Sequence, residues 1–152
     1  MRDLTSRKFR EWYWKKKAGA GLVVASIGVE EEIRIGEEVV LEGNSSSSEY
    51  GVVFEDDGTT GYLYALEFGD EENPILDAMQ IYTVSSVVDR DEPSTIKILW
   101  SDDGVKAALL INDYPHAVVD FANHQGFCRT KFPSPGENWT RPEWSDQAFE
   151  DF

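Results

Sequence analysis

A run of short apolar segments separated by turn-forming residues, over positions 96–132, constrains the fold of this chain more than any other feature. The β-prone stretches are residues 96–100, 105–111, 114–121 and 126–132. The turns between the first three are Asp102-Asp103-Gly104 and Asn112-Asp113, and such residues tolerate the positive φ angles that tight hairpins need. This spacing predicts an antiparallel meander long enough to form the centre of a sheet.

Further β-prone segments precede this meander. They are residues 22–27, 37–42, 50–55 and 62–68, the last two forming a hairpin around residues 56–61. Segment 75–88 is ambiguous, because its start favours a helical turn whereas residues 81–84 are β-branched or aromatic. We therefore expect a short turn that leads into a strand.

The tail from residue 133 is rich in Pro and Trp. Its three prolines and one glycine before residue 143 exclude regular structure over most of its length. Trp139 and Trp144 are expected to hold the tail against an apolar part of the sheet. Ser145 suits the N-cap of a single helical turn over residues 145–152.

Residues 1–17 differ in charge from the rest of the chain. They carry seven Lys or Arg against two acids, a charge of +5, whereas the remainder carries seven basic and 27 acidic side chains, a charge of -20. Phe9, Trp12 and Tyr13 have helical spacing, which predicts a short basic helix over residues 3–17. Such a helix suits a membrane surface or, as charge complementarity favours, the acidic body of its own chain.

Together these patterns predict an α+β fold in a single domain. The expected architecture is a mainly antiparallel sheet of roughly six or seven strands within residues 18–152, with the N-terminal helix and the irregular C-terminal tail packed against it. A length of 152 residues suits one domain. The apolar run at residues 18–29 is too short and glycine-rich to cross a bilayer, and the single cysteine, Cys128, cannot form an internal disulfide. We expect a cytoplasmic protein.

The net charge of -15 restricts the classes of partner. An acidic body repels nucleic-acid phosphates, which need cationic neutralisation, so no nucleic acid is expected to bind. It attracts a basic protein through electrostatic steering. Solubility, or adaptation to a salty cytoplasm, explains the same charge without a partner. Neither a cofactor nor a resident metal is expected.

Four polar side chains form the candidate ligand-binding site: Tyr64, His116, Asp120 and Arg129. If residues 122–125 connect the last two strands, Asp120 and Arg129 become diagonal neighbours on one face, and His116 lies on that face too. His116 and Asp120 are then about 13 Å apart, which excludes a direct acid–base dyad. The cluster is interpreted either as an ion pair that fixes sheet register or as a pocket in which Arg129 holds a carboxylate or phosphate.

Two other motifs have weaker chemistry. The carboxylates of Asp56-Asp57-Gly58 suit calcium, but the series is too short for the six to eight oxygens that calcium needs, and a hairpin turn explains it equally well. Cys128, four residues after His124, has no evident third group to orient a nucleophile. It is interpreted as a packed strand residue, and no catalytic residue is assigned.

Two segments resemble a family of small bacterial proteins of unknown function. The first is Glu55-Asp56-Asp57-Gly58 followed by Thr60-Gly61-Tyr62-Leu63-Tyr64-Ala65-Leu66. The second is Tyr114-Pro115-His116-Ala117, then Asp120-Phe121, Gly126-Phe127-Cys128-Arg129-Thr130 and Phe132-Pro133. The likeness extends over about residues 36–145. It implies a single domain and carries no mechanism.

The leading functional hypothesis is a non-enzymatic, cytoplasmic binding protein that recognises another, basic, protein. An immunity protein or an inhibitor is one concrete version. The hypothesis depends on the charge imbalance, the aromatic content and the absence of a complete catalytic set in the sequence. The alternative is a small-molecule sensor or enzyme that uses the polar cluster of Tyr64, His116, Asp120 and Arg129.

Overall fold

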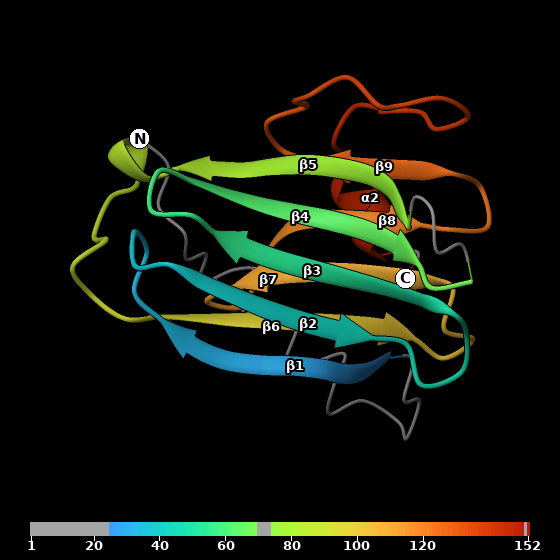
Figure 1. Ribbon diagram of the computed structural model, residues 1–152, viewed down its shortest axis with the longest axis horizontal. Coiled ribbons are helices and arrows are strands. Elements are labelled where there is room, and N and C mark those ends of the chain that lie inside the picture. The colour runs from blue at the N-terminus through green and yellow to red at the C-terminus, as the bar shows by residue number, and fades with distance from the viewer. Residues whose placement is uncertain (1–24, 70–73, 151) are drawn as a thin grey trace.

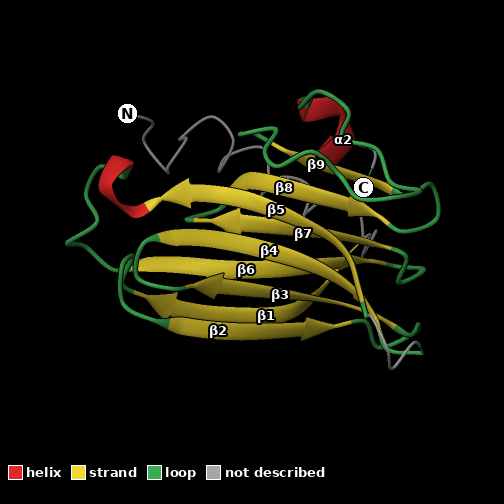
Figure 2. Ribbon diagram, turned by 45° about the horizontal axis from the view of Figure 1, so that its top comes forward, coloured by secondary structure: helices red, strands yellow, loops and turns green. Residues whose placement is uncertain are grey.

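The computed structural model describes residues 25–69, 74–150 and 152, which fold into two antiparallel sheets packed face to face (Figures 1 and 2). The strands are β1 (Ala25–Ile33), β2 (Val39–Asn44), β3 (Tyr50–Asp56), β4 (Thr60–Glu67), β5 (Ile75–Thr83), β6 (Ser94–Ser101), β7 (Lys106–Ile111), β8 (Tyr114–Asp120) and β9 (Gln125–Cys128). One sheet has five strands in the order β1-β6-β7-β8-β9, and the other has four in the order β2-β3-β4-β5. A 3-10 turn, η1 (Val84–Ser86), and a helix, α2 (Asp146–Glu150), complete the described elements.

The predicted meander is confirmed as strands β6 to β9 of the five-stranded sheet. Asn112 and Asp113 join β7 to β8 and both have positive φ, 52° and 64°, as a two-residue hairpin turn requires. Gly104, with a φ of 74°, lies in the turn between β6 and β7. The last strand is shorter than expected and ends at Cys128.

The four-stranded sheet is also a meander, built on a similar acidic turn. Gly58 has a φ of 93° between β3 and β4. The Oδ1 atom of Asp57 accepts the backbone N–H groups of Thr60 at 2.8 Å and Thr59 at 2.9 Å, and these hydrogen bonds lower the pKa of Asp57. The turn therefore uses its carboxylates to satisfy its own backbone.

The expected α+β class with a single sheet is wrong. The described residues form nine strands in two sheets, and their only α-helix is the five-residue α2. The chain changes sheet after β5, and β1 pairs with β6 instead of its sequence neighbour β2. Each sheet has an apolar face, and two such faces bury each other more completely than a helix and a tail would cover one sheet. The helix expected over residues 3–17 lies outside the described residues.

The main core lies between the two sheets. The residues that alternate inward supply it, including Val52, Phe54, Leu63 and Met79 from one sheet and Ile96, Ile98, Leu109 and Ile111 from the other. Near one end of the sandwich, the ring of Phe121 stacks on Tyr50 at 4.3 Å and on Trp100 at 5.7 Å between centroids. This aromatic column joins the two sheets.

The C-terminal tail covers the outer face of the five-stranded sheet, as Figure 2 shows for α2 beside β8 and β9. A second apolar cluster forms there, made of Leu99, Ala108, Leu110, Val118 and Phe149. The Oγ atom of Ser145 accepts the N–H of Gln147 at 3.1 Å, in the capping position that the sequence predicts. No helix in the described part of the chain has the length and apolar character needed to cross a bilayer.

Candidate functional site

The four residues of the predicted polar cluster lie on opposite sides of the sandwich. Tyr64 is on β4, and its hydroxyl donates to Glu55 Oε1 at 3.1 Å on the outer face of the four-stranded sheet. His116 and Asp120 alternate with inward-facing Ala117 and Val119 on β8, so they share the outer face of the other sheet. The structure therefore separates Tyr64 from the other three residues.

The last hairpin also has a different register from the predicted one. Asp120 lies opposite Gln125, and Val118 lies opposite Phe127, because the connecting turn begins one residue earlier and ends one residue earlier than expected. The Asp120 carboxylate accepts the backbone N–H of Asn123 at 3.1 Å and its side-chain amide at 2.8 Å. It holds the turn, and the expected diagonal pair with Arg129 does not form.

Arg129 fastens the tail to the sheet. Its guanidinium lies 4.2 Å from the ring centroid of Tyr114 and 4.6 Å from that of Trp144, and its Nε donates to the carbonyl of Pro115 at 2.6 Å. A further contact with Asp146 measures 3.5 Å. His116 is buried and meets the Tyr114 ring edge-on at 5.6 Å. These contacts hold α2 and the tail against the sheet, so Arg129 has a structural role. The buried His116 lies beside these contacts.

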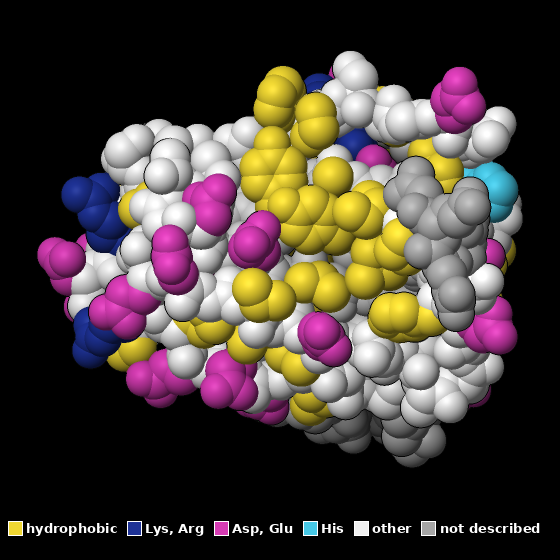
Figure 3. Space-filling model, viewed as in Figure 1, with side chains coloured by type: hydrophobic (Ala, Val, Ile, Leu, Met, Phe, Trp, Pro, Cys, Tyr) yellow, Lys and Arg dark blue, Asp and Glu magenta, His cyan; other side chains and the backbone are white. Residues whose placement is uncertain are grey.

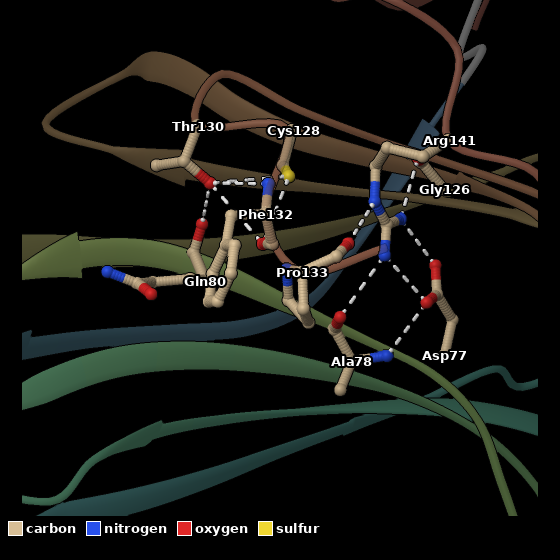
Figure 4. A network of polar contacts seen from close by, with 9 residues as sticks. All are labelled: Asp77, Ala78, Gln80, Gly126, Cys128, Thr130, Phe132, Pro133 and Arg141. Carbon is tan, nitrogen blue, oxygen red and sulfur yellow. Dashed lines mark hydrogen bonds and ion pairs between the residues drawn. The ribbon is translucent and has the colours of Figure 1, made fainter. Parts of the chain in front are cut away.

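The side chains of the other sequence motifs also make structural contacts within the fold. Cys128 is buried, with its sulfur 3.6 Å from Thr130 Oγ1, and His124 instead stacks on Trp139 at 5.4 Å (Figure 4 shows Cys128). In the Asp56 turn, the carboxylate of Asp56 accepts three hydrogen bonds from within the protein. Across residues 25–69, 74–150 and 152, no group of three or more His, Cys, Asp or Glu side chains is placed to hold a metal ion.

A buried ion pair between Asp77 and Arg141, which was not predicted from the sequence, links β5 to the tail (Figure 4). Arg141 donates from Nη1 to Asp77 Oδ2 at 2.6 Å and from Nη2 to Asp77 Oδ1 at 2.8 Å. It also donates to the carbonyls of Gly126, Ala78 and Pro133. Because these contacts engage every nitrogen of the guanidinium, the pair joins β5, β9 and the tail and leaves little capacity for a ligand.

The sequence did contain one signal for this pair. Asp77 is the single charged residue inside β5, and its side chain is only 1% exposed. A buried carboxylate needs a cationic partner, and the tail between residues 133 and 145 has one arginine.

The outer face of the four-stranded sheet has the strongest features of a binding surface. Its centre, which we call the tyrosine face, consists of Val53, Tyr62, Tyr64, Leu66 and Ala78, brought together by cross-strand pairing. Tyr62 and Tyr64 stack at 5.9 Å between ring centroids. Figure 3 shows this apolar area, and in Figure 1 no described segment lies in front of β3 and β4.

Exposed apolar side chains and carboxylates surround the tyrosine face. Val40 is 58% exposed on β2 and Phe132 is 54% exposed beside β5. Glu42 lies opposite Val53, and Glu55 lies opposite Tyr62, so both carboxylates stand on the same face as the tyrosines. Partial burial and the hydrogen bond to Glu55 raise the pKa of Tyr64, which keeps this phenol protonated. The surface offers apolar contacts and acceptor oxygens.

Comparison with known proteins shows that this chain is similar to bacterial proteins. A family described as an uncharacterized protein conserved in bacteria, DUF2251, matches residues 33–152. An uncharacterized protein of Haemophilus influenzae is 43% identical over 103 residues, which cover 66% of this chain. The same match spans 64% of the length of that curated relative. No solved structure matches.

Proposed function

We propose that this chain, which belongs to the bacterial family DUF2251, is a non-enzymatic, cytoplasmic binding protein that recognises a basic protein through its tyrosine face. The partner surface that fits is apolar at its centre and carries Lys or Arg around it. An immunity protein or inhibitor with a basic target is one version of this function.

The observation that carries the proposal is the unequal covering of the two outer sheet faces. The tail covers one of them with Trp144, Phe149 and Phe152, whereas the other presents the tyrosine face to its surroundings. Contiguous exposed apolar area of this kind marks interaction sites on monomeric proteins. Tyrosine is also enriched at interfaces, because its ring supplies apolar area and its hydroxyl accepts a polar partner.

Charge supports a basic partner over an acidic or neutral one. The sequence after residue 17 has a charge of -20, and Glu42 and Glu55 stand within the candidate surface. Complementary charge raises the association rate and suppresses wrong partners, while the apolar centre supplies most of the affinity. This arrangement predicts binding that weakens as salt is added.

The test is site-specific photocrosslinking of the full chain in its native cell, with a crosslinking amino acid at Val53. We expect a covalent adduct with a basic protein, and no such adduct from the matched position Ile27, which is exposed on β1 of the other sheet. Tyr64→Ala should weaken the affinity of the captured partner by about tenfold or more, because truncating a central aromatic anchor has that effect.

Glu42→Gln combined with Glu55→Gln should slow association, whereas Glu31→Gln on β1 should not. Identical adducts from positions 53 and 27, or a partner whose affinity is unchanged by Tyr64→Ala, would contradict the proposal. A crosslink from position 53 to residues 1–17 of the same chain would identify an internal occupant instead. A chain that lacks those residues then serves as the control that separates the two occupants.

A further inference from the structure

A cavity of about 510 Å³ opens at the end of the sandwich where β4 and β5 meet the turn after β8 and the tail. Its volume lies in the range typical of small-molecule pockets. Both sheets and the tail contribute to its walls, through Tyr50, Glu67, Leu76, Phe121, Glu137 and Trp139. It is separate from the tyrosine face, because Tyr62, Tyr64 and Val53 do not line it.

The apolar wall of this cavity is rigid and aromatic. Phe121 is buried between Tyr50 and Trp100, and it meets the Trp139 ring edge-on at 6.0 Å. The tail is fixed immediately after Trp139, by Thr140 N–H to the His124 carbonyl at 3.0 Å and by the Asp77–Arg141 pair. A ligand would therefore meet a wall that is already in place, which lowers the entropy cost of binding.

The two carboxylates of the cavity lining belong to Glu67 and Glu137. Glu67 follows inward-facing Leu63 and Ala65 on β4, so its side chain points toward the cavity end of the sandwich. No residue of the described chain donates a hydrogen bond to its half-buried carboxylate or forms an ion pair with it. Glu137 is exposed in the same lining, which also includes His124 and Asn138, and the described lining contains no Lys or Arg.

We propose that this cavity binds a small organic cation, in which an ammonium group contacts Glu67 and an attached aromatic or branched apolar body packs on Trp139 and Phe121. An ammonium group at Glu67 would form a charge-assisted N–H···O bond, which is stronger than a bond between neutral groups. An anion would be repelled by both glutamates, and a neutral apolar ligand would desolvate Glu67 without compensation.

The test uses phenethylammonium as the probe, with 2-phenylethanol and phenylacetate as its neutral and anionic analogues of matched shape. Titrations of the full chain are followed by nuclear magnetic resonance at the Trp139 indole and the Glu67 amide. We expect saturable shifts with the ammonium compound at millimolar concentration, and at least about fivefold weaker binding of the two analogues, because only the ammonium compound carries a charge opposite to that of Glu67.

Glu67→Gln, which keeps the shape of the side chain, should reduce ammonium affinity by about fivefold or more and remove the preference over 2-phenylethanol. The matched control is Glu92→Gln, in an exposed loop, and Tyr64→Ala on the tyrosine face should also leave the affinity unchanged. Equal binding of the three compounds, shifts that do not include Trp139, or an affinity insensitive to Glu67→Gln would each overturn the proposal.

Discussion

At the scale of single residues, Asp56 joins two turns and a strand. Its Oδ2 atom accepts the N–H of Gly36 at 2.8 Å and the hydroxyl of Tyr82 at 2.6 Å, while Oδ1 accepts the N–H of Gly58 at 2.8 Å. The Tyr82 ring lies over Gly61, where a Cβ would approach it to 2.6 Å. Asp56 therefore connects the β1–β2 turn, the β3–β4 turn and β5, and its burial is compensated by these donors.

Tyr82→Phe is expected to lower the free energy of unfolding by about 1–3 kcal/mol, because it leaves a buried acceptor without one of its donors. The matched control is Tyr64→Phe, whose hydroxyl contacts a partly exposed glutamate and should contribute about 0.5 kcal/mol or less. Urea denaturation of both variants at neutral pH measures the difference. Equal losses in the two variants would contradict the role assigned to Asp56.

Loss of the Tyr82 hydroxyl should also change how the free energy of unfolding depends on pH. Burial, followed by the hydrogen bond to Asp56, raises the pKa of Tyr82 well above its ordinary value of 10.0. The contribution of the Tyr82 hydroxyl to the free energy of unfolding is therefore complete below pH 10. It is lost as pH rises further, since the unfolded chain releases the proton first. Above pH 10, wild-type stability should fall more steeply than that of Tyr82→Phe.

At the scale of elements, local residue types predict the hairpins. They do not predict a segment whose conformation depends on a residue far away in the sequence. The Asn112-Asp113 turn was predictable because its residue types favour positive φ. The start of β5 was not, because Leu76-Asp77-Ala78-Met79 suits a helical turn locally. The strand forms there because Arg141, 64 residues away, pairs with Asp77 and because Met79 enters the inter-sheet core.

The polar cluster was mispredicted for a related reason. One strand shows which residues share a face, and this placed His116 and Asp120 correctly on one side of β8. The turn to β9 lies one residue earlier in the chain than expected, which places Arg129 opposite His116, with its N–H donating to the His116 carbonyl at 3.3 Å. Tyr64 was misplaced because no local pattern assigns a strand to one sheet of a sandwich or the other.

Gly126→Ala tests the junction of β5, β9 and the tail. A Cβ at this position would collide with Asp77 Oδ2 and lie 2.6 Å from Arg141 Nη1, so the buried pair must move. We expect a loss of about 3 kcal/mol in the free energy of unfolding, as for other broken buried pairs. Gly136→Ala is the control, since nothing lies within 4 Å of its Cβ, and it should change stability by less than about 0.5 kcal/mol. Similar values for both alanines in chemical denaturation would contradict the assigned role of the junction.

At the scale of the whole molecule, the uneven charge acts on folding and on partner binding in opposite directions. The sequence after residue 17 has a charge of -20, and several of its seven cations are engaged in local pairs, such as Lys97 with Asp113 and Lys131 with Glu143. The remaining carboxylates repel one another in the folded state more than in the expanded unfolded chain. The tyrosine face uses part of the same charge to attract a basic partner.

Added salt should therefore stabilise the fold and weaken the proposed complex. Screening of the surface carboxylates by about 0.5 M NaCl should raise the unfolding midpoint by a few degrees, given about 2–4 °C per kcal/mol for a chain of this size. The same salt should slow association with a basic partner. Calorimetric melting and stopped-flow binding measure the two effects separately.

Glu42→Gln combined with Glu55→Gln distinguishes the two effects. The double variant removes the Glu42 and Glu55 carboxylates from the binding face and leaves the other acidic residues in place. The salt dependence of the unfolding midpoint should therefore persist, while the salt dependence of association decreases. A midpoint that falls with salt would mean that attractive pairs dominate the folded surface. An association rate whose salt dependence is unchanged in the double variant would mean that the partner is steered to a different surface.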